Sequence, residues 1–230
     1  MAAGKANEGA SVKGFEAQAR EALRVSAATL AEAAKRNAVA VAQAAETIVD
    51  CFESGGTVYF CGNGGSAADA QHLAAEFAGR YLIDRPGLPA VALTTNSSAL
   101  TAIGNDYGYD DVFARQLESL GSPGDVLVAI TTSGKSASIR NAVAAADALG
   151  MTVIGMTGEK GAEFAATCDI ALVSPSAHTP NIQEAHIAMG HAFCLLVERA
   201  LFPVPAGSAA KRPAKAPAKS KGARPRGRKK

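Results

Sequence analysis

Short apolar runs alternate with helical patterns along most of this chain. Each run is rich in Val, Ile, Leu and Ala, and each ends in a polar or glycine-rich loop that leads into a helix. The expected strands span residues 57–61, 90–93, 125–131, 152–156 and 170–173. Strands that are apolar on both faces and alternate with helices predict a parallel sheet with helices on both sides. We therefore expect an α/β three-layer sandwich around a doubly wound, flavodoxin-like, five-stranded parallel sheet.

Helical patterns fill the intervals between these strands and also precede the first one. The expected helices span 67–79, 99–103, 112–120, 137–149, 162–167 and 181–201. Residues 14–53 form an Ala-rich helical stretch with a discontinuous apolar face. Because Ala permits close approach of helices, we expect these N-terminal helices to pack on another subunit or across the domain.

The composition fits one globular domain. Of 230 residues, 48% are hydrophobic, and no apolar stretch approaches the roughly 20 residues that span a bilayer. The first 20 residues mix Lys, Asn, Glu and Gly and have no signal-peptide core, so we expect a cytoplasmic protein with no membrane partner. The four cysteines are scattered, which favours reduced, buried thiols.

The positive net charge is concentrated at one end of the chain. Residues 206–230 hold ten of the 23 Lys and Arg residues and no acid, which leaves 13 basic against 21 acidic residues elsewhere. This Ala/Pro/Lys/Arg tail is predicted to be disordered, and residues 1–13 to be a flexible N-terminus, with the folded domain at 14–203. The tail either contacts polyanions non-specifically or is a solvated extension.

The first strand runs into Gly62-Asn63-Gly64-Gly65-Ser66, at the start of a helix. Glycines allow backbone N–H groups to approach a ligand, and the helix N-terminus favours an anion. The segment also fits the loose dinucleotide fingerprint, which needs an acidic residue at the end of the second strand to hold the ribose. That strand ends in Leu93-Thr94-Thr95, which argues against NAD.

A second polar loop, Thr131-Thr132-Ser133-Gly134-Lys135-Ser136, follows the third strand. Its hydroxyls precede a helix and suggest a phosphate nest, although Ser136 alone is also explained as a helix cap. The loop lacks Walker A spacing, so ATP is not expected. Together the two loops predict a small phosphorylated ligand. A third loop at 104–108 offers Asn105 and Asp106 to sugar hydroxyls, or is simply a turn.

Histidines and acids gather on the two helices that adjoin these loops. His72 and Glu76 are four residues apart and project from one face of their helix, a spacing found in metal sites and in ordinary surface pairs. The last helix adds Gln183, Glu184, His186 and His191. Helical spacing does not choose between His186 and His191.

The combined motifs resemble the phosphoheptose isomerase family, whose members have the sugar-isomerase (SIS) fold. The likeness extends from about residue 15 to 203. It is carried by Gly62–Ser66, His72-x-x-x-Glu76-x-x-x-Arg80, Arg85-Pro86-Gly87, Gly104–Gly108, Thr132–Ser136 and Ile182-Gln183-Glu184-x-His186-x-x-x-x-His191.

The resemblance implies isomerisation of sedoheptulose 7-phosphate to D-glycero-D-manno-heptose 7-phosphate, the entry to ADP-heptose and cell-envelope glycan synthesis. It implies one Zn²⁺ per subunit, bound by His72, Glu76, Gln183 and His191, and so favours His191 over His186. It also implies a homo-oligomer, typically a tetramer. The sugar phosphate is expected to contact Glu76 and Gln183 together with Asn63, Gly64, Gly65, Ser66, Asn105, Asp106, Thr131, Thr132, Ser133 and Ser136.

Ketose–aldose isomerisation needs a base beside the carbonyl and a group that returns the proton. Glu76 is the candidate base and His191 the candidate proton shuttle. The sequence does not divide the catalytic and metal-ligand roles of these two residues.

Proteins with two other functions share this fold. A non-catalytic relative associates with the bacterial replication initiator and shares the Leu201-Phe202-Pro203 ending. Such relatives resemble the enzyme less at Glu76 and His191, which this chain retains. A sugar-phosphate-sensing regulator would need a DNA-binding module, and the sequence contains no such motif.

Overall fold

The computed structural model describes residues 12–203, so the expectations for the tail and for residues 1–11 lie outside the described residues. Five strands form one parallel sheet in the order β2-β1-β3-β4-β5. They are β1 (Val58–Gly62), β2 (Ala90–Ala92), β3 (Val126–Ile130), β4 (Thr152–Gly158) and β5 (Ile170–Ser174). This is the flavodoxin-like order, and the predicted fold class is confirmed.

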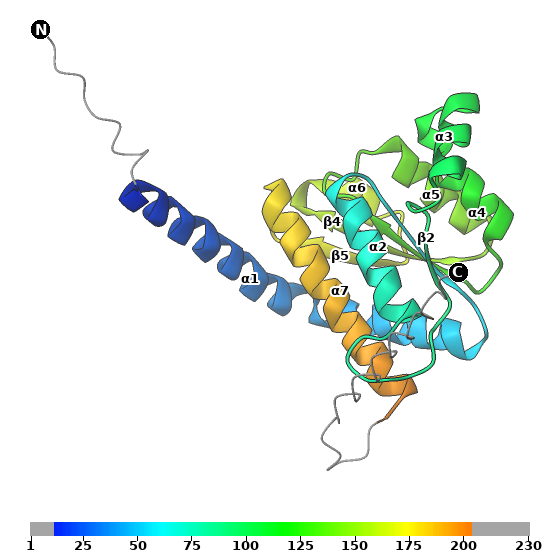
Figure 1. Cartoon of the computed structure of the whole chain (residues 1–230), viewed down its shortest axis with the longest axis horizontal. Helices are drawn as coiled ribbons and strands as arrows, with labels where there is room; N and C mark the ends of the chain where they lie inside the picture. The colour runs from blue at the N-terminus through cyan, green and yellow to red at the C-terminus, as the bar shows by residue number, and fades with distance from the viewer. Residues whose placement is uncertain (1–11, 204–230) are drawn as a thin grey trace, which may run out of the picture.

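Helices cover both faces of the sheet (Figure 1). They are α1 (Val12–Glu53), α2 (Gly65–Ala78), α3 (Ser97–Asp106), α4 (Ala114–Leu120), α5 (Ala137–Ala148), α6 (Ala162–Ala165) and α7 (Thr179–Leu201), with short 3-10 helices η2 (Tyr109–Asp111) and η3 (Glu159–Gly161). Alternate strand residues enter opposite apolar clusters. Val58 and Phe60 pack with α1, α2 and α7, whereas Tyr59 and Cys61 pack with α4 and α5. Both faces of β1 are therefore buried, as a three-layer sandwich requires.

A single 42-residue helix, α1, replaces the several N-terminal helices that we expected, and it already includes residues 12 and 13. Its second half packs on α7, and Asn37 exchanges two hydrogen bonds with the backbone of Val173 on the edge strand β5. Its first turns extend beyond the sheet, where Phe15 and Leu23 are exposed (Figure 1).

Two other expectations differ from the structure. The predicted loop at 104–108 is largely helical, because α3 continues through Gly104 to Asp106. The predicted helix at 162–167 is only one turn long, after a 3-10 turn. Within residues 12–203, no helix is long and apolar enough to cross a membrane.

Candidate active site

The two polar loops lie at the carboxyl ends of neighbouring strands. β1 pairs with β3 in a register that places Gly62 opposite Ile130, so the loops 62–66 and 131–136 begin side by side. Chain connections run to opposite sides of the sheet from these two strands, and open parallel sheets bind ligands at such a switch point. The fold thus brings together the two segments that the sequence singled out.

The first loop is tightly built from backbone. Gly64 has a φ of +57° and precedes the first residue of α2, and no side chain caps this helix. A side chain on Gly62 would overlap the backbone of Ser66. The start of α2 therefore presents its N-terminal end without a side-chain cap, which suits an anion.

Asn63 is held by residues that the sequence did not indicate. Its side-chain nitrogen donates to the Ser138 hydroxyl at 2.9 Å, and its oxygen accepts from the Tyr109 hydroxyl at 2.8 Å. Ser138 lies just beyond the hydroxyl-rich loop, but no spacing rule connects it or Tyr109 to Asn63. These bonds tie the first loop to α5 and η2.

Hydroxyls of the second loop have distinct environments. Thr131 is buried and its Oγ1 accepts from the N–H of Gly134, while Ser133 Oγ accepts from the N–H of Lys135. Ser136 is the N-cap residue of α5, yet its side chain makes no capping hydrogen bond. The helix-cap explanation of Ser136 is therefore not supported by the geometry.

Asn105 and Asp106 lie exposed at the end of α3, where the amide of Asn105 donates to the carboxylate of Asp106 at 2.8 Å. The two residues precede Tyr109, whose hydroxyl donates to Asn63 of the first loop. The structure therefore connects this segment to the loop through Tyr109.

Helices α2 and α7 lie side by side and run in the same direction (Figure 1). Gly65 touches the Gln183 amide at their beginnings, and Leu73 touches Gly190 further along. A Cβ on Gly190 would come within 2.6 Å of Leu73 Cδ2, so a glycine is needed for this close approach. The pairing places His72 of α2 beside His191 of α7.

Three side chains converge between these helices. His72 Nε2 lies 2.8 Å from His191 Nε2 and 3.3 Å from a carboxylate oxygen of Glu76. The three ligand atoms lie within 4.8 Å of one another. Because the two rings lie so close, one imidazole must donate a hydrogen bond to the other. The cluster therefore contains three electron-pair donors and few protons, and a set of ligands like this suits a divalent cation. Gln183 lies eight residues before His191, with its amide against Gly65 at the loop end of the helix pair.

The other candidate histidine, His186, is not one of the three converging ligands. It is fully buried and neither ring nitrogen has a hydrogen-bond partner within the described structure. Burial lowers its pKa to about 4. Geometry therefore places His191, and not His186, with His72 and Glu76.

Two further groups border the cluster. Asp69 lies one turn before His72, and burial raises the pKa of its carboxyl, one oxygen of which has no partner among the described residues. The ring of Tyr81 lies 5.8 Å from that of His191. The spacing of Asp69 and His72 was a usable signal in the sequence; the position of Tyr81 depends on a loop that the sequence does not define.

The fold is a parallel α/β sheet with two polar loops at its switch point and a His/Glu cluster on the adjoining helices. The SIS domain family model matches residues 23–158 of this chain. The phosphoheptose isomerase of Rhodospirillum rubrum is 57% identical over 164 residues, which cover 71% of this chain and 87% of that protein. That of Burkholderia pseudomallei is 53% identical over 182 residues, or 79% of this chain and 91% of that protein.

A solved structure gives the same result. The phosphoheptose isomerase of Neisseria gonorrhoeae superposes with a TM-score of 0.76 at 45% identity, covering 80% of this chain and 98% of that one. This chain therefore belongs to the phosphoheptose isomerase family of SIS-domain proteins. The resemblance noted in the sequence is confirmed.

Proposed function

We propose that this chain isomerises sedoheptulose 7-phosphate to D-glycero-D-manno-heptose 7-phosphate through an enediol, with Glu76 as the base. Membership of the family supplies the substrate and the reaction class, as the first step of heptose precursor synthesis. The observation that carries the mechanism is the convergence of His72, Glu76 and His191 beside the two loops. The same convergence disfavours the non-catalytic binding protein, which has no use for an acid–base cluster.

The loops hold the phosphate and sugar. The N-terminal end of α2, which has no side-chain cap, and the Ser136 hydroxyl, which makes no capping bond, are suited to the phosphate. The substrate ligands that we propose are Asn63, Gly64, Gly65, Ser66, Glu76, Asn105, Asp106, Thr131, Thr132, Ser133, Ser136 and Gln183.

A zinc ion would be held by His72, Glu76 and His191. The family resemblance adds Gln183 as a fourth ligand, but the Gln183 amide lies against Gly65 at the start of the helix pair and is not part of this cluster in the described structure. When bound, it would polarise the substrate carbonyl and stabilise negative charge on the neighbouring oxygens. The N/O donor set fits this metal.

The proton transfers are assigned to this chain's own residues. Glu76 takes a proton from C1 of the ketose, the C1–C2 bond becomes the enediol, and a proton returns to C2 to give the aldose. His191 moves the hydroxyl protons between O1 and O2, since an imidazole both donates and accepts near neutral pH. No atoms are gained or lost.

We further propose that the active protein is a cytoplasmic homo-oligomer, a tetramer as in the family resemblance. The exposed apolar residues at the start of α1, among them Val12, Phe15 and Leu23, support an interface there. The predicted polyanion contact of the tail remains a separate expectation.

The direct test is to incubate the purified protein with sedoheptulose 7-phosphate, with and without added zinc, and to detect the aldose by chromatography. We expect turnover that a chelator abolishes and zinc restores. Absence of turnover together with binding of replication initiator protein would instead establish the non-catalytic alternative.

A further inference from the structure

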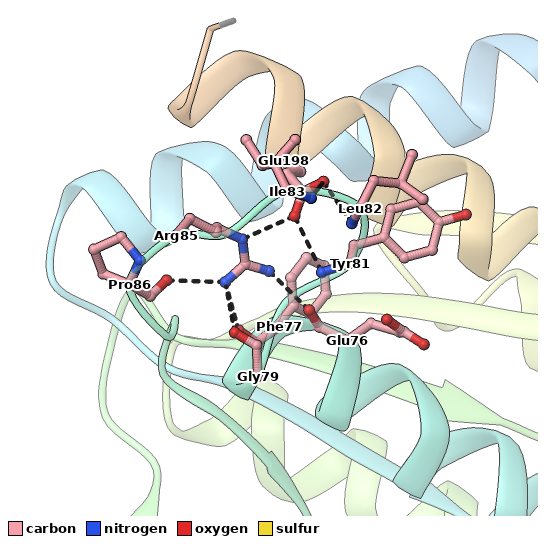
Figure 2. Close-up of polar contacts among 9 residues, drawn as sticks. All are labelled: Glu76, Phe77, Gly79, Tyr81, Leu82, Ile83, Arg85, Pro86 and Glu198. Atoms are coloured by element: carbon pink, nitrogen blue, oxygen red, sulfur yellow. Dashed lines mark hydrogen bonds and ion pairs between the residues drawn. The ribbon is translucent and has the colours of Figure 1, made fainter. Parts of the chain in front are cut away.

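A buried ion pair joins α7 to the loop that follows α2 (Figure 2). Arg85 Nε lies 3.1 Å from Glu198 Oε1, and the side chains are 1% and 4% exposed. Among the ion pairs of residues 12–203, it is the one in which both side chains are buried. Local sequence patterns do not indicate this pair, because its partners lie 113 positions apart in the chain.

Arg85 caps the end of α2. Its Nη2 donates to the backbone carbonyl of Glu76 at 2.7 Å, and its Nη1 donates to the carbonyls of Phe77 at 2.8 Å and Pro86 at 2.9 Å (Figure 2). The last carbonyls of a helix have no partner within the helix, and its C-terminal end carries partial negative charge. The Arg85 guanidinium donates hydrogen bonds to these carbonyls and offsets the partial negative charge. One of the carbonyls is that of Glu76, the residue that we propose as the base.

Glu198 orders the loop that follows. Its carboxylate accepts from the backbone N–H groups of Tyr81 at 3.1 Å, Leu82 at 2.8 Å and Ile83 at 3.3 Å, in addition to Arg85. The loop is thereby held against α7, with the Tyr81 ring next to His191.

The geometry relates this ion pair to the acid–base cluster. Glu198 lies seven residues after His191, close to two helical turns, so both project from the same face of α7. Glu198 and Arg85 therefore connect the face of α7 that carries His191 to the peptide carbonyl of Glu76 on α2.

We propose that Arg85 and Glu198 are positioning residues for the isomerisation, which fix Glu76 relative to His191. The inference rests on the proposed function of that cluster. Burying an ion pair costs desolvation energy that packed apolar side chains would avoid, so the pair is a poor device for stability alone. What it supplies is fixed geometry, and misplacement of a catalytic group by about 1 Å can cost roughly 100-fold in rate.

The test is Arg85→Lys, which keeps the charge but cannot reach Glu198 and the carbonyls of Glu76 and Phe77 together. We expect kcat to fall by about 10- to 100-fold with KM changed less than about threefold. In the metal-free protein, zinc affinity measured by chelator competition should fall by about tenfold or more, since the ligands lie on both helices.

The matched control is Asp125→Asn. Asp125 is also a buried carboxylate that accepts from two backbone N–H groups, those of Thr57 and Ser122, but it directly precedes the central strand β3, and these hydrogen bonds reach neither α2 nor α7. The Asp125→Asn substitution should lower the melting temperature while leaving kcat and zinc affinity within about twofold of the parent protein. If Arg85→Lys does not fold, Glu198→Gln, which retains a backbone acceptor, takes its place.

Folded Arg85→Lys protein with kcat and zinc affinity within twofold of the parent would overturn the proposal. Equal losses in Asp125→Asn would overturn it too, because the effect would then be general destabilisation. The zinc titration does not require turnover, so it tests positioning even if the parent protein fails to isomerise the sugar.

Discussion

The loops at the switch point and the helix pair α2/α7 differ in the chemical groups that they present. The loops present backbone N–H groups and hydroxyls. Within them, the Asn63 side chain is hydrogen-bonded to Ser138 and Tyr109. The helix pair contributes charged and titratable groups, brought together by the close contact of Leu73 and Gly190. We propose that the first arrangement holds an anion and the second transfers protons. Binding and turnover should therefore be separable by mutation.

The largest expected effect comes from the helix side. Glu76→Gln removes the proposed base without changing its size, so turnover should fall by about 10²- to 10⁴-fold. Binding of the sugar phosphate, measured by calorimetry, should stay within a few fold. Near-normal turnover would exclude Glu76 as the base.

The two histidines of α7 should differ in what they control. Because the pKa of His186 in the folded protein is about 4, the unfolded chain binds more protons between pH 6.5 and 4. The free energy of unfolding should therefore decrease as pH falls through this window, with roughly 2 kcal/mol lost to His186 between pH 7 and 5. Urea unfolding of His186→Leu should lack this part of the decrease. An unchanged pH dependence in the variant would show that His186 finds a proton acceptor.

A smaller effect is expected on the loop side. Ser136→Ala removes a hydroxyl that makes no capping bond, so the melting temperature should hardly change while KM rises by about tenfold. A fall in stability without a rise in KM would mean that Ser136 acts as a cap after all.

The smallest effect is expected from removing the basic tail. Deleting residues 206–230 should leave kcat and KM within about twofold, because the proposed site lies within residues 63–191. A collapse of activity in the same assay would give the tail a role in catalysis or assembly.

The sequence predicted the sheet well because apolar strands between helices follow from local patterns, and all five strands occur where expected. It predicted the two loops because each follows a strand. It did not predict that Asn63 is held by Tyr109 or that Arg85 pairs with Glu198. Helical spacing did not choose the histidine that faces His72, although the family resemblance favoured His191, which the structure places there. The contacts of Glu198 and His191 depend on how α7 docks on α2, and the contact of Asn63 with Tyr109 depends on where η2 lies. Helical periodicity alone defines neither arrangement.

The end of α3 illustrates the same limit. Gly104 suggested a break, yet α3 continues to Asp106, because a glycine in the last turn of a helix costs only about 1 kcal/mol. Asn105 and Asp106 were identified from the sequence as candidate sugar ligands, but their helical structure was not predicted.

The central claim is that the helix pair transfers a proton and the loops hold the phosphate. It is tested most directly by running the isomerisation in D₂O and locating deuterium in the product by NMR. An enediol formed by Glu76 predicts deuterium at C2 of the aldose, with exchange at C1 of recovered ketose, and both signals should disappear in Glu76→Gln. Efficient conversion with no deuterium at C1 or C2 after many turnovers would indicate direct hydride transfer and contradict the account.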